Sequence, residues 1–110
     1  MQQKTPLSVV IIALNAASQI EACLKSAAFA DEIVVVDSGS QDDTREIALK
    51  YGARVLHQDW LGFGRQKQFA VDRASHDWVL CLDADERVGD PLRASIVEAL
   101  QEPRFRAYRV

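Results

Sequence analysis

Short apolar runs alternate along the chain with segments in which apolar residues recur at helical intervals. The runs predict strands, and they cover residues 7–14, 33–36, 53–57 and 78–82. The helical segments cover residues 18–27, 44–51, 65–74 and 90–100, and residues 105–110 have the pattern of the opening of a fifth strand. The first run does not alternate between apolar and polar positions, which is typical of a central strand buried on both faces.

Polar residues at the edges of these segments predict where the helices begin. Ser18 and Glu21 have the spacing of a capping box, in which side chains accept hydrogen bonds from free N–H groups at a helix start. The polar turn 37–44 can cap the second helical segment. Asp90 before Pro91 predicts a capping aspartate followed by proline at the first helical position.

This order of elements predicts an α/β fold. Strands that alternate with helices form βαβ units, which build a mostly parallel, Rossmann-like sheet with helices on both faces. The chain has 110 residues, 48% of them apolar, and shows no interdomain linker, so residues 1–110 are expected to form one domain with its own core. Because the last predicted strand reaches the end of the sequence, we expect this domain to be the front part of a longer protein.

The charge balance and the two cysteines narrow the function classes. Lys and Arg number 13 against 16 Asp and Glu, a net charge of −3, and no basic block occurs, which argues against binding to nucleic acid. Cys23 and Cys81 lack metal-ligand or CxxC spacing and are interpreted as core residues in a reducing compartment. The first dozen residues lack a signal-peptide pattern, and residues 7–14 are too few to span a bilayer. These features predict a cytoplasmic protein.

Polar residues follow three of the predicted strands. Asn15 follows the first, Asp37 the second, and Asp83, Asp85 and Glu86 the fourth. Since ligands of open parallel sheets bind at the carboxyl ends of the strands, we expect these side chains to converge on one edge. Turn-forming and helix-capping roles would explain the same residues equally well.

The pair Asp83 and Asp85 carries a more specific prediction. Two carboxylates this close, where a strand ends and the chain turns, repel each other unless a cation or a donor lies between them. Mg²⁺ and Mn²⁺ are typically held by one or two carboxylates together with substrate phosphates, and such an ion offsets charge on a departing diphosphate. We therefore expect a divalent-cation site here.

A glycine-containing loop precedes the third helical segment. Gly62 and Gly64 allow close approach of the backbone to a ligand, the helix start offers free N–H groups, and Arg65 and Lys67 add positive charge. This combination is typical of a diphosphate-binding element. A flexible turn with solvated basic residues has the same composition, so both interpretations stay open.

Several nearby residues have simpler interpretations. Residues 42–44 are assigned to a helix start, and His57 to a strand end. Ser38 lacks the GxSxG pattern of a serine hydrolase. Trp60 and Phe63 either stack on a base or acceptor or pack over the edge of the core.

Four motifs in this order resemble those of family 2 glycosyltransferases of the GT-A fold. They are Val9–Asn15, Ile33–Thr44, Gly62–Phe69 and Leu82–Glu86. The resemblance spans nearly all of residues 7–88, and the last two motifs are most similar to the bacterial branch that includes lipopolysaccharide-core β-glucosyltransferases. It implies that this chain is the nucleotide-sugar-binding half of such an enzyme.

The resemblance also implies how a UDP-sugar donor is bound. Ala13, Asn15 and Asp37 would hold the nucleoside, with Asp37 accepting a hydrogen bond from the uracil or the ribose. Arg65 and Lys67 would lie near the base or the diphosphate.

The fourth strand would supply the rest of the donor site. Asp83 would face the ribose, Asp85 would bind Mn²⁺ or Mg²⁺, and Glu86 would support the metal site. The enzyme would transfer a hexose to a bacterial glycan or glycolipid acceptor such as the lipopolysaccharide core, in peripheral contact with the cytoplasmic face of the inner membrane. Members of the family invert the anomeric centre with a carboxylate base, which we expect beyond Val110.

Two other function classes stay open. A receiver-type phospho-acceptor domain has a similar sheet and an aspartate cluster, but it needs an acidic pair after the first strand, where this chain has Asn15 and two alanines. A nucleotidyltransferase of related fold usually carries a glycine- and lysine-rich signature at the same place, which is absent from residues 15–19.

Overall fold

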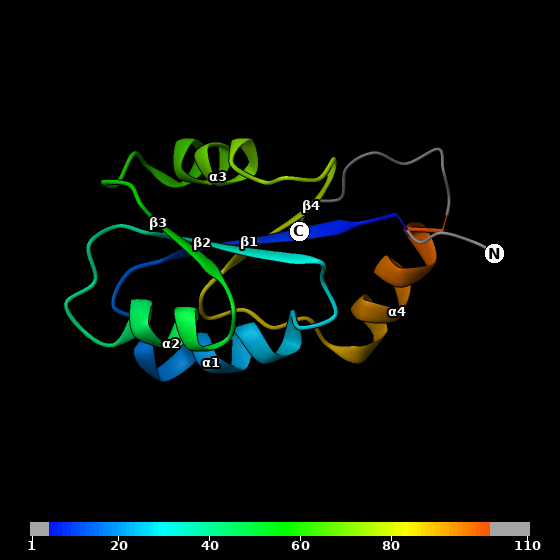
Figure 1. Ribbon diagram of the computed structural model, residues 1–110, viewed down its shortest axis with the longest axis horizontal. Helices are drawn as coiled ribbons and strands as arrows, with labels where there is room; N and C mark the ends of the chain where they lie inside the picture. Colours follow the sequence, from blue (N-terminus) through cyan, green and yellow to red (C-terminus); the bar gives the residue numbers. More distant parts are fainter. Residues whose placement is uncertain (1–4, 102–110) are drawn as a thin grey trace.

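Strands and helices alternate through residues 5–101, the part of the chain that the computed structural model describes (Figure 1). The elements are β1 (Leu7–Ala13), α1 (Ala17–Ser26), β2 (Glu32–Asp37), α2 (Thr44–Lys50), β3 (Arg54–His57), α3 (Phe63–Asp72), β4 (Trp78–Asp83) and α4 (Asp90–Ala99). The strands form one parallel sheet in the order β3-β2-β1-β4. The predicted α/β fold with a parallel sheet is confirmed, and the fifth strand expected at 105–110 lies outside the described residues.

The central strand β1 is buried along its whole length. Val9 and Ile11 pack into a core with α1, α2 and α4, whereas Val10 and Ile12 pack into a second core with α3. Figure 1 shows the same division, with α3 alone on one face of the sheet. Because both faces are covered, each position of the strand needs an apolar or small side chain, which explains why the sequence pattern does not alternate.

The register of the strands brings their carboxyl ends level with one another. Ala13 of β1 pairs with Asp37 of β2, and Asp37 pairs with His57 of β3. On the other side of β1, Ile12 pairs with Asp83 of β4. The loops that follow the strands therefore start from one edge of the sheet.

The capping box predicted for the first helix is wrong. Helix α1 begins at Ala17 without a side-chain cap of its own, and Ser18 lies inside it. The Ala16 N–H donates to Thr44 Oγ1 at 2.8 Å, and the Ala17 N–H donates to Asp42 Oδ2 at 3.1 Å. The loop before α2 thus satisfies the free N–H groups of α1, so a local cap is not needed.

Two other helix starts differ from the prediction by one or two residues. Asp90 is the first residue of α4 rather than its cap, Gly89 takes the cap position, and no side chain caps this helix. Helix α3 begins at Phe63, because Gly62 adopts a φ of +95° that turns the chain into the helix. Within residues 5–101, none of the helices has the length and apolar character needed to cross a membrane.

Candidate functional site

A cleft of about 560 Å³ lies at the carboxyl ends of the strands. Three of the predicted site residues, Ala13, Asp83 and Asp85, line it together. The remaining lining residues come from the segments after β1, β2, β3 and β4 and from the end of β1 itself: Ile12, Leu14, Ala16, Gln19, Ser38, Trp60, Phe63 and Ala84. Of the five polar residues expected to converge at this edge, Asp83 and Asp85 line the cleft, whereas Asn15, Asp37 and Glu86 are not among its lining residues.

The acidic motif after β4 forms a tight turn. The Asp83 N–H donates to Glu86 Oε1 at 2.6 Å, and the Glu86 N–H donates back to the Asp83 carbonyl at 2.9 Å. Glu86 therefore uses one carboxylate oxygen to hold the turn. Asp85 lies between them on the exposed side.

Asp83 has a carboxylate oxygen without a hydrogen bond. Its Oδ1 is buried and unsatisfied, and Lys67 Nζ lies 3.7 Å from it. A buried oxygen of this kind costs free energy unless a donor or a cation reaches it. No group of three or more His, Cys, Asp or Glu side chains suited to a metal ion occurs in residues 5–101. The carboxylates of Asp83 and Asp85 nevertheless fit Mn²⁺ or Mg²⁺, because these ions commonly complete their coordination with ligand phosphates and water.

Cys23 is a buried thiol next to this turn. Its thiol contacts the Asp83 carbonyl at 3.8 Å. Burial, followed by the charges of Glu86, Asp85 and Asp83, raises the pKa of the Cys23 thiol to about 12. The same charges favour a cation at the turn.

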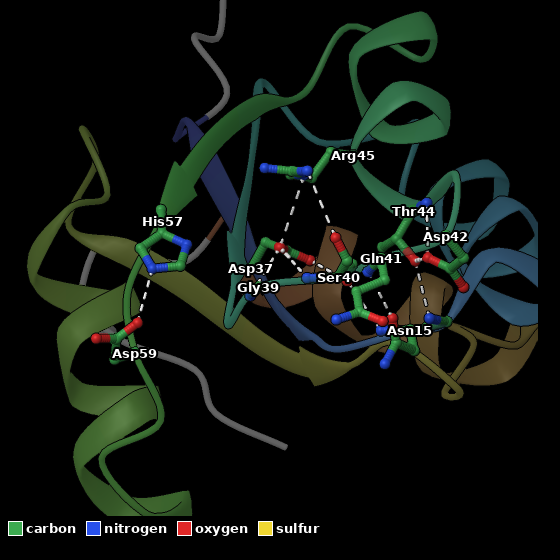
Figure 2. Close-up of polar contacts among 11 residues, drawn as sticks. Asn15, Asp37, Gly39, Ser40, Gln41, Asp42, Thr44, Arg45, His57 and Asp59 are labelled. Carbon is green, nitrogen blue, oxygen red and sulfur yellow. Dashed lines mark hydrogen bonds and ion pairs between the residues drawn. The ribbon is translucent and has the colours of Figure 1, made fainter.

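Asp37 ends β2 as a fully buried carboxylate that organises the following loop (Figure 2). Its Oδ2 accepts hydrogen bonds from the N–H groups of Gly39, at 3.0 Å, and Ser40, at 2.8 Å, and its Oδ1 is bonded to the Ser40 hydroxyl. Arg45 Nε lies 3.9 Å from Oδ2. Asp37 borders the cleft through this loop and does not line it.

Asn15 joins the same network. It has a φ of +49°, in the left-handed region that asparagine tolerates better than most residues. Its N–H donates to Ser40 Oγ at 2.8 Å, and its Oδ1 accepts from the Gln41 N–H at 2.8 Å, as Figure 2 shows. Asn15 and Asp37 therefore meet through Ser40, next to the cleft.

The two predicted basic residues of α3 have different positions. Lys67 approaches the acidic turn through its ion pair with Asp83. Arg65 is exposed and does not line the cleft. Of the two basic side chains, the structure thus brings Lys67 to the acidic turn.

Some residues that shape the cleft were left open by the sequence, as Trp60 and Phe63 were, or were not identified from it, as Gln19 and Gln66 were not. Trp60 and Phe63 contact each other edge to face, with ring centroids 4.9 Å apart, and are 50% and 67% exposed, so they do not pack over the core. Gln19 lines the cleft and Gln66 is buried behind it. Gln19 lies outside the four motifs, and although Gln66 lies within the motif 62–69, the sequence does not show that its side chain is buried.

Comparison with known proteins shows similarity along most of the chain. A family model described as Glycosyl transferase family 2 matches residues 8–108. The lipopolysaccharide core biosynthesis glycosyltransferase LpsC of Rhizobium meliloti is 39% identical over 105 residues, which cover 91% of this chain and 39% of the relative. The low-salt glycan biosynthesis hexosyltransferase Agl6 of Haloferax volcanii is 40% identical over 86 residues, which cover 72% of this chain and 21% of the relative. The chain spans less than half the length of either relative.

Solved structures of two bacterial proteins have a similar fold. Glucosyl-3-phosphoglycerate synthase from Mycobacterium tuberculosis, in complex with Mn²⁺, uridine diphosphate and glucosyl-3-phosphoglycerate, aligns with a TM-score of 0.73 and 31% identity, covering 91% of this chain and 41% of that protein. S. aureus TarS 1–349 aligns with a TM-score of 0.71 and 28% identity, covering 84% and 31% respectively.

Proposed function

The chain belongs to glycosyl transferase family 2 and has the GT-A fold, and on this premise we propose that it is the part of a transferase that binds a UDP-sugar donor. The observation that carries the proposal is the position of Asp83 and Asp85 together in a cleft at the carboxyl ends of the strands. Family membership favours this function over the receiver-type domain and the nucleotidyltransferase.

The nucleoside is proposed to lie against the ends of β1 and β2. Ala13 lines the cleft there, and Asn15 and Asp37 hold the adjoining loop. A direct hydrogen bond from uracil or ribose to Asp37 stays a prediction, and it requires the loop to admit the ligand, because Asp37 has no exposed surface. Lys67 and Arg65 are proposed to lie near the base or the diphosphate.

The acidic turn is proposed to bind the remainder of the donor. Asp83 faces the ribose, where its unsatisfied Oδ1 can accept a hydroxyl hydrogen bond, and Asp85 holds Mn²⁺ or Mg²⁺. Glu86 supports both by fixing the turn. When bound, the ion supplies positive charge that offsets the charge developing on the departing diphosphate. The mycobacterial neighbour, solved with Mn²⁺ and uridine diphosphate, supports this assignment.

For the whole enzyme we propose inverting transfer of a hexose to a bacterial glycan or glycolipid. The name of the rhizobial relative supports the lipopolysaccharide core as the acceptor. Peripheral contact with the inner membrane is a further part of the proposal. Residues 1–110 are proposed to form one donor-binding domain. The catalytic base and the acceptor-binding residues are proposed to correspond to regions of the longer relatives that this chain does not span.

Thermal unfolding with several ligands tests the donor-binding proposal. UDP is expected to raise the melting temperature, and UDP with Mn²⁺ is expected to raise it further, because a ligand that binds only the folded state stabilises it. CTP and acetyl phosphate serve as comparisons. Absence of any UDP effect contradicts the proposal, a preference for the triphosphate favours the nucleotidyltransferase, and covalent phosphorylation by acetyl phosphate favours the receiver domain.

A further inference from the structure

Gln66 is a fully buried polar side chain near the start of α3 that joins two segments bordering the cleft. Its Oε1 accepts a hydrogen bond from the Leu61 N–H at 3.1 Å. Its Nε2 donates to the Gln58 carbonyl and to Ser38 Oγ, both at 3.1 Å. One amide group therefore binds the segment after β2 and, at two points, the segment after β3.

These partners lie in the two segments that follow the neighbouring strands β2 and β3, and both segments contribute lining residues to the cleft. Ser38 lines it after β2, while Gln58 and Leu61 flank Trp60, which lines it after β3. Trp60 is half exposed and contacts Phe63 edge to face, so the core does not determine its place. The loop that carries Trp60 is held from beneath by Gln66.

We propose that Gln66 is a positioning residue that holds Trp60 and Ser38 at set places in the lining of the cleft, and so determines the shape that the donor nucleotide meets. The hydrogen bonds of Gln66 resist movement of the two segments away from α3, because breaking them would leave its buried amide group without partners. The effect on the nucleotide rests on the proposed function. The effect on Trp60 does not depend on any ligand.

The first test measures the position of Trp60 without ligand. Gln66→Met in the 110-residue chain keeps the side-chain length and removes all three hydrogen bonds. Acrylamide quenching of tryptophan fluorescence is expected to rise by about twofold, because Trp60 gains freedom while Trp78, 3% exposed, contributes little. Gln68→Met is the matched control, since Gln68 is exposed on the same helix and its side chain donates to the neighbouring Asp72 of that helix. Unchanged quenching in a folded Gln66→Met protein overturns the proposal.

The second test measures UDP binding by calorimetry with Mn²⁺ present. Gln66→Met is expected to raise the Kd by about tenfold through lost preorganisation, and Gln68→Met by less than about twofold. A lower melting temperature with an unchanged Kd would make Gln66 merely structural and overturn the proposal. If the unaltered chain does not bind UDP, the donor-binding function fails, and quenching alone decides the role of Gln66.

A second variant covers the case in which Gln66→Met does not fold. Gln66→Glu keeps the shape of the side chain and the acceptor for the Leu61 N–H, but it loses the amide donor to Gln58 and Ser38. It is expected to show the same increase in quenching. Wild-type quenching in folded Gln66→Glu overturns the proposal.

Discussion

Replacement of Asp37 by alanine is expected to lower the free energy of unfolding by about 3 kcal/mol. Its carboxylate accepts hydrogen bonds from the Gly39 N–H and from both the N–H and the hydroxyl of Ser40. Gly39 is exposed, so water can replace its bond, whereas Ser40 is 4% exposed and both of its donors would lose their partner. Each buried group left without a partner costs about 1–3 kcal/mol, so the N–H and the hydroxyl of Ser40 together account for the expected loss of about 3 kcal/mol. Arg45 adds little, because its side chain is 48% exposed.

Urea unfolding followed by far-UV circular dichroism measures this loss. In a domain of this size the same change lowers the melting temperature by about 12–24 °C. Asp43→Ala is the matched control, because Asp43 lies in the same loop, is exposed and makes no side-chain capping bond, so its loss is expected to stay below about 1 kcal/mol. A loss below about 1 kcal/mol in Asp37→Ala would refute the reasoning from the hydrogen bonds.

Three further predictions concern the metal, the effect of pH and the buried thiol. Asp85→Ala is expected to abolish the Mn²⁺-dependent part of the UDP-induced rise in melting temperature and to keep the fold; an unchanged rise would exclude Asp85 as the metal ligand. Burial alone would raise the pKa of Glu32, but hydrogen bonds from Ser75 and Ser8 outweigh it, so the pKa lies below its ordinary 4.5. The ionised Glu32 carboxylate therefore stabilises the folded state above about pH 4.5, and this stabilisation is lost as the pH falls through the folded-state pKa. Between about pH 5 and pH 3, the melting temperature of Glu32→Gln should fall by less than that of the unaltered chain. Since burial raises the pKa of Cys23 to about 12, a disulfide reagent at about pH 8 should label this thiol only on unfolding, and rapid labelling of the folded protein would contradict its buried position.

The alternation of buried strands with helices, and with it the parallel sheet, was predictable because its cause is local in the sequence. Each buried strand is a short apolar run, and β1 has no polar alternation because helices cover both of its faces. The start of α1 was not predictable in this way. Its N–H groups bond to Asp42 and Thr44, which become neighbours of Ala16 only after the sheet has formed.

The sequence predicted part of the candidate site. The rule that ligands bind at strand ends identified Asp83 and Asp85, which share the cleft. It also selected Asp37, but the sequence does not reveal that this carboxylate is turned inward to hold a loop. Gln66 lies within the motif 62–69, but its hydrogen bonds to residues 5, 8 and 28 positions away are tertiary contacts that the sequence does not reveal.

The N–H groups at the start of α1 are capped by Asp42 and Thr44, and this has a consequence for the stability of the helix. The Ala16 N–H bonds to a hydroxyl 28 residues later, so the start of α1 has this partner only when the segment around Thr44 is in its place beside β1 and β2. An isolated peptide of residues 16–27 would lack this partner and fray at its start. The stability of the first turn of α1 therefore depends on the loop that leads into α2.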